Sequence, residues 1–491
     1  MADSKYKKLM SNTAIYGIGT FASKMLVFLL TRLYTECLTT GEYGTADLIT
    51  NMANLLIPLA AAGVCDGIFR FALDSSLNKK SVFSTGLGIL AVSSAIFFAL
   101  SFALLGFDFF REYLWLVILY VLMSNFHSAC ALYIRALDKT KLYAVQGILN
   151  TVTTIAFNIF FLLVLPENSF FNGVNGYVLS IVIADFIIGT FLLLYARLYR
   201  DISVRSFDKD LARQLLKYSL PLVPTTIFWW ITNVSDRFMV TYFCGEGING
   251  IYTAAYKIPT LIILVTGVFS EAWQFSAVKE SDKSEREAFY TTVFKYFKAV
   301  VFVIGAFVVA FSQIIASILY AKEYFSAWNH IPVLVGSSIF SALVNFLASV
   351  YMVKKKSVNS FLTAMLGALV NIALNFVLIP ESLDLFGTSI PLAGWGAQGA
   401  AVATLVSYVV VFFVRAFDSR KFLKFDFGVV NIALNSLILS AQAVIMLFAQ
   451  NTVILIVGQA ICIVGIIAVN AKPLINAFGS LVRGLLKRKK S

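Results

Sequence analysis

Apolar runs long enough to cross a lipid bilayer recur along the whole chain, and short polar connections separate them. A membrane-spanning helix needs about 20 predominantly apolar residues. Windows of about this length predict fourteen helices. They lie near 12–34, 44–64, 82–105, 113–134, 145–165, 172–196, 219–243, 250–273, 296–319, 329–352, 358–379, 394–414, 429–449 and 452–471. The pattern therefore predicts an all-α integral membrane protein with about fourteen transmembrane helices.

The polar residues are distributed unevenly between alternate connections. If the N-terminus is cytoplasmic, nearly every Lys and Arg falls in a cytoplasmic connection or a terminal tail. The exceptions are Arg111 and Lys322 in outer connections, and Lys24, Arg32, Arg237 and Lys257 within the spans. Lys and Arg are enriched in the cytoplasmic loops of membrane proteins, and a wrong span count would scramble this distribution. We therefore expect a multi-pass protein with both termini in the cytoplasm.

The two ends of the chain fit this topology. The first residues are basic and then apolar, with no small-residue cleavage site, which predicts an uncleaved first span. The last segment, 472–491, predicts a basic amphipathic helix at the membrane surface. The net charge of +13 follows from the cytoplasmic Lys and Arg residues and needs no nucleic-acid partner.

The chain also carries a weak internal repeat. Arg32 precedes a Gly near the start of the next helix, and Arg237 does so in the second half. The segments "GVNGYVLSIV" and "GAQGAAVATLVS" open the predicted sixth and twelfth helices with the same G-x-x-G pattern. Helices 1–6 thus resemble helices 7–12 in the same orientation, a parallel repeat. The predicted parts are an N-terminal six-helix lobe (1–196), a cytoplasmic linker (197–218), a C-terminal six-helix lobe (219–414), helices 13–14 (415–471) and the tail (472–491).

Composition excludes several other classes of protein. The chain is 59% hydrophobic and only 13% charged, whereas soluble domains are about 45–50% apolar. It has 2 His and 5 Cys residues, and the cysteines are scattered without C-x-x-C spacing. We therefore expect neither a metal site nor a disulfide framework.

Three segments resemble a known family. "TRLYTECLTTGEYGTADL", "DRFMV" followed by "GIYTAAYKIP", and "GAQGAAVATLVS" resemble the polysaccharide flippase branch of the multidrug/oligosaccharidyl-lipid/polysaccharide exporter superfamily. The resemblance covers nearly the whole chain. It implies movement of undecaprenyl-pyrophosphate-linked oligosaccharide from the inner to the outer leaflet of a bacterial plasma membrane, by alternating access between two lobes. It also implies a role in cell-surface polysaccharide biosynthesis, with other polysaccharide-assembly membrane proteins as partners. A monomer suffices, because both lobes lie in one chain.

Charged and polar residues inside the spans are expected to face the bundle interior or water. The predicted substrate-binding residues are the cations Lys24, Arg32, Arg237 and Lys257, together with Asn51, Asn233 and Trp230. The guanidinium fork of arginine can hold phosphate oxygens, so these residues predict a cavity for an anionic head group carrying sugars. The alternative is interhelical packing with structural ion pairs, such as Arg237 with Asp236 or with Asp47.

The transport that the resemblance implies needs a source of energy other than ATP hydrolysis by this chain. The sequence has no G-x-x-x-x-G-K-[ST] phosphate loop, which excludes ATP hydrolysis by this chain and predicts no bound cofactor. Coupling to H⁺, Na⁺ or the membrane potential remains. The predicted ion-coupling or gating residues are Asp185, Asp47, Asp236 and Glu271. Asp185 is the first candidate for coupling, and an ion pair with Lys24 is the structural alternative.

Two other functions compete with the flippase. A drug/cation antiporter of the same superfamily predicts an acid-dominated cavity, and the surplus of cations argues against it. A membrane sugar polymerase or ligase needs catalytic groups on a sizeable outer loop. The longest outer connection, 380–393, has two acids and no His. We therefore expect a transporter and not an enzyme.

Overall fold

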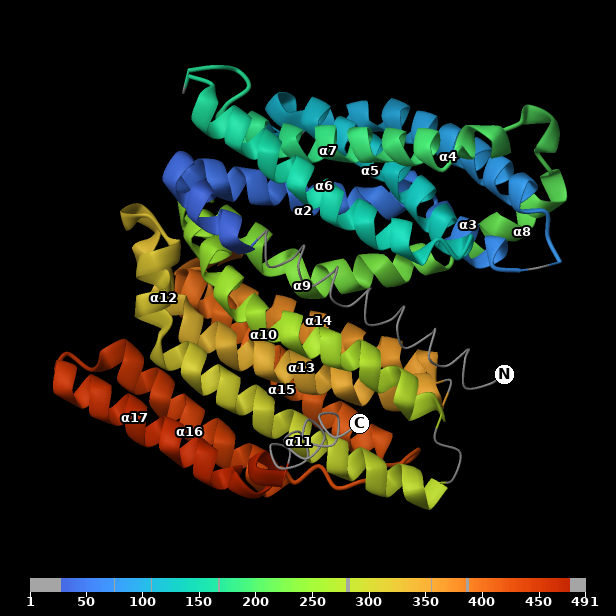
Figure 1. Ribbon diagram of the computed structural model, residues 1–491. Coiled ribbons are helices and arrows are strands. Elements are labelled where there is room, and N and C mark those ends of the chain that lie inside the picture. Colours follow the sequence, from blue (N-terminus) through green and yellow to red (C-terminus); the bar gives the residue numbers. More distant parts are fainter. Residues whose placement is uncertain are drawn as a thin grey trace, which may run out of the picture. The chain divides into compact units, whose positions relative to one another are not determined.

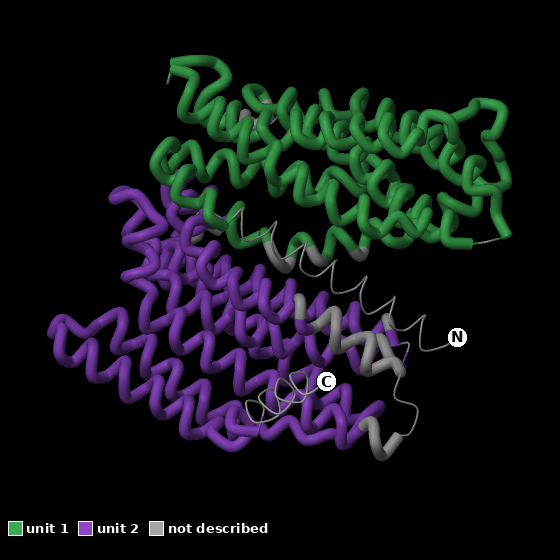
Figure 2. Tube along the Cα trace, in the orientation of Figure 1, with its two compact units in different colours: residues 1–238 green, residues 239–491 purple. Residues whose placement is uncertain are grey.

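The structure is a computed structural model. It describes residues 28–476, apart from 75, 107, 167, 280–282, 355 and 386–387. Figure 2 shows two compact units, Met1–Phe238 and Met239–Ser491, which divide within one helix. The lobes and the linker expected from the sequence stay predictions.

Unit 1 is a bundle of long helices with a few short ones (Figure 1). Its helices are α2 (Thr40–Ala60), α3 (Val64–Ala72), α4 (Lys79–Ser101), η1 (Phe102–Gly106), α5 (Asp108–Ala136), α6 (Thr140–Ile159), η2 (Phe160–Val164), α7 (Gly173–Tyr195), η3 (Leu198–Asp201), η4 (Val204–Ser206), α8 (Lys209–Ser219) and α9 (Leu222–Cys244), which continues into unit 2. One apolar core lies among α3, α4, α5 and α8, and a second among α2, α5 and α7. Both cores include residues of α5, so this helix is the centre of the unit.

Unit 2 has a helical bundle and one β-hairpin. Its elements are α10 (Glu246–Lys279), α11 (Lys283–Ala310), α12 (Ser312–Leu319), η5 (Lys322–His330), α13 (Ile331–Val353), α14 (Ser357–Leu378), β1 (Ser382–Leu385), β2 (Thr388–Pro391), α15 (Gly396–Ser419), α16 (Val429–Phe448) and α17 (Thr452–Val469). The span that contains α13 is the most buried of the candidate spans, and α13 packs against α10, α11, α14, α15 and α16. The antiparallel pair β1–β2 lies in the outer connection 380–393, for which the sequence predicted no helix.

The predicted all-α membrane class is confirmed. Among the described residues, 11 helices are long and apolar enough to cross a membrane, and the bent pair α2–α3 raises the number to 12. Of the expected first span, 12–34, the structure describes residues 28–34, which belong to a helix that continues to residue 37. The seventh expected span appears as α9, a helix outside those eleven. The count of fourteen therefore stays a prediction.

The second expected helix, 44–64, is wrong in its bounds. It begins earlier, after a capping box in which Thr39 and Glu42 exchange hydrogen bonds, and it bends by 56° between α2 and α3. At the bend the N–H of Gly63 donates to the carbonyl oxygen of Pro58 at 2.9 Å, part of the Schellman pattern that ends many helices. Ala62 and Gly63 both have positive φ, 48° and 66°. No apolar periodicity signals this turn, because both sides of it are apolar.

Substitutions at the bend test its packing. A Cβ on Gly63 would lie 2.8 Å from the carbonyl oxygen of Ser219, so Gly63→Ala is expected to destabilise unit 1 by about 1–3 kcal/mol. Ala62→Gly is the control, because it relieves a left-handed alanine and should be neutral or stabilising within about 1 kcal/mol. Thermal unfolding in detergent measures both. Equal losses of stability in the two variants would contradict the account.

Candidate functional site

An ion pair joins α2 to α9 inside unit 1. The Nη1 of Arg237 lies 2.7 Å from the Oδ1 of Asp47, and the Asp47 side chain is only 7% exposed. The Oδ2 of Asp47 is buried and has no hydrogen-bond partner within the described part of the chain. A charge-assisted bond of this length holds the guanidinium at a fixed place in the helical bundle. Of the two pairings left open by the sequence, the structure therefore has the one between Arg237 and Asp47.

Polar groups on the same faces of the two helices continue this contact. The Nδ2 of Asn51 donates to the carbonyl oxygen of Asp47 at 2.8 Å, one turn back along α2. The Nε1 of Trp230 donates to the carbonyl oxygen of Asn51 at 2.7 Å. Trp230 and Arg237 are seven residues apart, so they share a face of α9. The structure thus brings together four of the predicted site residues: Asp47, Asn51, Trp230 and Arg237.

Asp236 occupies a different position. Its side chain is buried, and its Oδ1 accepts a hydrogen bond from the backbone N–H of Arg237 at 2.9 Å. Neighbouring residues of a helix point about 100° apart, so the two side chains leave α9 in different directions. Asp236 is therefore placed beside the ion pair without replacing Asp47 in it.

A second polar cluster surrounds Asp185 on α7. The Oδ1 of Asp185 lies 2.8 Å from the Nδ1 of His127 on α5 and accepts from the Nδ2 of Asn150 on α6 at 3.1 Å. The hydroxyl of Ser124 donates to its Oδ2. The Nε2 of His127 lies 2.7 Å from the Oε1 of Gln146. Asp185 thus joins three helices of unit 1, and among the described residues its ion-pair partner is His127.

The protonation state of this cluster is coupled to its hydrogen bonds. With Gln146 in the orientation described, both ring nitrogens of His127 face oxygen acceptors, an arrangement that satisfies the doubly protonated ring. A neutral His127 requires the Gln146 amide to turn and donate, because a neutral ring has one donor and one acceptor. The cluster can therefore hold or release one proton by a local turn of an amide.

The other predicted cations that the structure describes are Arg32 in unit 1 and Lys257 in unit 2. Arg32 donates through its Nε to Glu36 of the same helix at 2.6 Å, and its side chain is 42% exposed. Lys257 lies half-buried on α10 in unit 2. Lys24 and the side chains of Asn233 and Glu271 lie outside the described residues. The proposed four-cation cavity stays a prediction.

Sequence reasoning missed the partners of Asp185 and the burial of Arg415. Asn150 and Gln146 are four residues apart on α6, and His127 is one of two histidines, so their polarity within apolar spans was the available signal. Arg415 was expected in a connection, but α15 extends to Ser419 and buries it completely. Its Nη1 donates to the carbonyl oxygen of Val344 at 2.9 Å. Within the described residues, His, Cys, Asp and Glu form no group able to hold a metal ion.

The fold and these buried polar clusters define a multi-pass helical membrane protein. The family described as polysaccharide biosynthesis protein matches residues 9–273, more than half of the chain. The chain belongs to this family. The comparison with curated proteins found no match.

Solved structures of transporters share the fold. The lipid II flippase MurJ, in its inward closed conformation, aligns with a TM-score of 0.69 at 13% identity, over 96% of this chain and 100% of that chain. An inward-facing multidrug resistance MATE family transporter of the MOP superfamily aligns with a TM-score of 0.63 at 15% identity, over 81% and 95%. A MOP superfamily transporter from Pyrococcus furiosus aligns with 0.56 at 14% identity, over 84% and 96%. These likenesses concern the fold.

A double-mutant cycle tests the energetic coupling of the α2–α9 pair. Asp47→Asn and Arg237→Gln each leave one charge without its partner, and each is expected to cost about 3–5 kcal/mol of stability. The double variant removes both charges and should lose much less than the sum of the two. Thermal unfolding of the purified proteins in one detergent measures the cycle. Strict additivity would show that the pair is not a structural contact.

Proposed function

We propose that this protein moves an undecaprenyl-pyrophosphate-linked oligosaccharide from the inner to the outer leaflet of a bacterial plasma membrane, for the synthesis of a cell-surface polysaccharide. Its family is one of polysaccharide biosynthesis, and its fold is shared with a lipid II flippase. The observation that carries the proposal is the guanidinium of Arg237, which Asp47 holds inside a helical unit beside Trp230 and Asn51.

Arg237 can bind a phosphate group in exchange for the carboxylate of Asp47. A carboxylate and a phosphate oxygen both suit the planar fork of arginine. In the resting protein Asp47 neutralises Arg237, so no isolated charge is buried. A pyrophosphate that enters takes the place of the Asp47 oxygen on Arg237, and the displaced carboxylate is then free to bind a proton or a cation. Trp230 offers an aromatic face to a sugar ring, and Asn51 offers an amide.

The topology proposed with this function places both termini in the cytoplasm, as the distribution of Lys and Arg predicts. Transport proceeds by alternating access, with the two lobes of a single chain exposing the head-group site first to one leaflet and then to the other. The polyprenyl tail stays in the lipid throughout. A monomer is sufficient for this cycle, and other polysaccharide-assembly proteins of the membrane supply and consume the lipid-linked sugar.

The drug/cation antiporter is the alternative, because MATE transporters share the fold. An organic cation requires a carboxylate without its own counter-charge. Asp47 is paired with Arg237, and Asp185 is paired with His127 and hydrogen-bonded to Asn150. Within the described residues, neither of these two carboxylates thus offers the unpaired charge that the antiporter would need. A membrane sugar polymerase or ligase is the second alternative, and no observation favours it.

We assign ion coupling to the cluster of Asp185 and His127. The two residues lie on different helices of unit 1, so a change in their charge changes how α5 and α7 are held together. A proton taken from one side of the membrane and released to the other would bias the lobes toward one state. Na⁺ is the other candidate ion, because Asp185 and the carbonyl groups of Asn150 and Gln146 are oxygen ligands.

Removal of the Arg237 charge is the test of the head-group site. Arg237→Ala is expected to reduce export of surface polysaccharide at least about tenfold, because a charge-assisted bond contributes about 1.5–3 kcal/mol. The Asp47→Asn/Arg237→Gln double variant separates loss of the anion ligand from misfolding, since it buries no unpaired charge. It should be stable and inactive. Arg205→Ala removes an exposed charge of unit 1 and is the matched control.

The measurement is surface polysaccharide at equal membrane levels of each variant. Wild-type export by both Arg237→Ala and the double variant would remove Arg237 from the substrate site.

Asp185→Asn tests the coupling site. The amide cannot carry a proton in exchange with His127, so the translocation rate in vesicles is expected to lose its response to an imposed proton or sodium gradient. Asp210→Asn, at an exposed acid of α8, is the control. A rate that responds to both gradients as in the wild-type protein would exclude Asp185 as the coupling group.

A further inference from the structure

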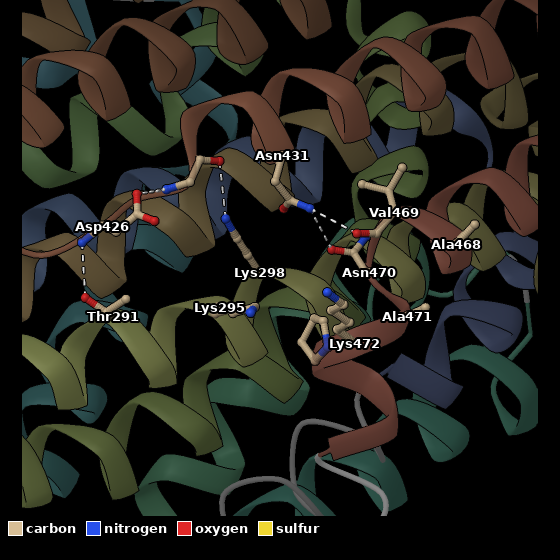
Figure 3. A pocket seen from close by; sticks show the side chains of 12 residues that line it. Thr291, Lys295, Lys298, Asp426, Asn431, Ala468, Val469, Asn470, Ala471 and Lys472 are labelled. Carbon is tan, nitrogen blue, oxygen red and sulfur yellow. Dashed lines mark hydrogen bonds between the residues drawn. The ribbon is translucent and has the colours of Figure 1, made fainter.

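A charged cavity lies in unit 2, on elements that the proposed transport site does not use. Its volume is about 620 Å³, and Figure 3 shows the side chains that line it. One wall is α11, with Thr291, Lys295 and Lys298. The opposite walls are the end of the α15–α16 loop with Asp426, the first turn of α16, and the chain that follows α17 with Lys472. Each wall of the cavity comes from a different helix or its connecting loop.

The lining of the cavity carries a surplus of positive charge. Lys295 and Lys298 are three residues apart on one face of α11, and Lys472 faces the same cavity from the end of the α16–α17 hairpin. In the part of the chain that the structure describes, neither Lys295 nor Lys472 has an ion-pair partner. Asp426 also lines the cavity, so three ammonium groups face one carboxylate. The surplus suits a ligand with one or two negative charges.

Lys298 holds the loop that leads into α16. Its residue is only 4% exposed, and its Nζ donates to the carbonyl oxygens of Phe427 at 2.9 Å and Gly428 at 3.3 Å. An ammonium group has three N–H donors, so one remains for a ligand. The carboxylate of Asp426 is turned to the loop, where its Oδ1 accepts from the N–H of Gly428 at 2.7 Å. The contacts of both side chains therefore hold the loop in place at one wall of the cavity.

The first turn of α16 forms part of the same wall. Gly428 stands at the N-cap with φ of 58°, and α16 runs for 20 residues from Val429. The first N–H groups of a helix have no acceptor within it, and the positive end of the helix dipole lies there. Asn431 in this turn lines the cavity as well. The positive end of the α16 dipole thus lies at a wall of the cavity that also carries ammonium groups, a combination that favours phosphate groups.

The surface next to the cavity is apolar. Val430 at the start of α16 is 74% exposed, and on α17 Val464 is 65% exposed and Ile467 is 38% exposed. Both helices are candidate membrane spans, so this face contacts lipid chains. In the topology proposed above the cavity lies at the cytoplasmic end of the spans. A basic pocket between transmembrane helices at that level is suited to the head group of an anionic lipid.

We propose that this cavity binds the phosphate group of an anionic membrane phospholipid, whose acyl chains lie along α16 and α17. Lys295, Lys298 and Lys472 supply the counter-charges, and the bound lipid ties the α16–α17 hairpin to α11. The site is separate from the ion pair of unit 1, and it does not depend on which substrate the protein moves.

Binding to the purified full-length chain in detergent tests the proposal. The probes are phosphatidylglycerol, phosphatidylcholine of the same chain length, and inorganic phosphate. Native mass spectrometry and thermal unfolding report binding and stabilisation. Phosphatidylglycerol is expected to bind and to raise the unfolding temperature, and phosphatidylcholine is not. Lys295→Ala/Lys472→Ala should weaken phosphatidylglycerol binding at least about tenfold, because each lysine contributes about fivefold and the two contributions multiply to about 25-fold.

The double variant leaves Lys298 and its loop contacts in place, so it keeps the fold. Arg205→Ala/Lys209→Ala removes two exposed charges from unit 1 and should bind as the wild-type protein does. Equal binding of phosphatidylglycerol by the wild-type protein and the Lys295/Lys472 variant would overturn the proposal. Equal stabilisation by inorganic phosphate alone would assign the cavity to a soluble anion and overturn the lipid assignment. None of these outcomes depends on transport activity.

Discussion

The cost of burying a charge among apolar helices governs this structure. Each buried ionic group of the described chain is held by a partner that offsets the loss of water. Asp47 neutralises Arg237, His127 faces Asp185, and Arg415 is held by carbonyl oxygens and a threonine hydroxyl. These contacts also decide which helices stay together, because each of them joins residues from different helices. The same constraint that stabilises the bundle therefore fixes where each of these charged groups lies within it.

The buried cations differ in how readily they can change partners. Arg415 binds carbonyl oxygens of two segments, and such groups cannot leave without breaking backbone contacts. Arg237 is paired with the side-chain carboxylate of Asp47, and a side chain can change partners without breaking backbone contacts. Lys298 lies between these cases, because it fixes a loop and still faces a cavity. A transporter needs the exchangeable kind at its substrate site and the fixed kind elsewhere.

Much of the fold could be predicted from apolar length and the distribution of Lys and Arg, since both reflect the bilayer directly. The bend between α2 and α3 could not, because its turn consists of apolar residues and glycine. Arg237 and Asp185 were predicted as site residues because a charge in a membrane span is costly. Their partners could not be assigned, because helical periodicity gives the face of a residue but not the neighbouring helix. His127 and Gln146 were overlooked for that reason, and Arg415 because the end of α15 was placed too early.

The central claim is that the protein flips a lipid-linked oligosaccharide, and one measurement tests it most directly. Cells depleted of the protein are extracted for lipids, which are analysed by mass spectrometry after leaflet-selective labelling. The account predicts that undecaprenyl-pyrophosphate-linked oligosaccharide accumulates in the inner leaflet, and the mass of the species identifies the sugar. The absence of any lipid-linked sugar build-up, together with greater sensitivity to cationic drugs, would contradict the account and favour the antiporter.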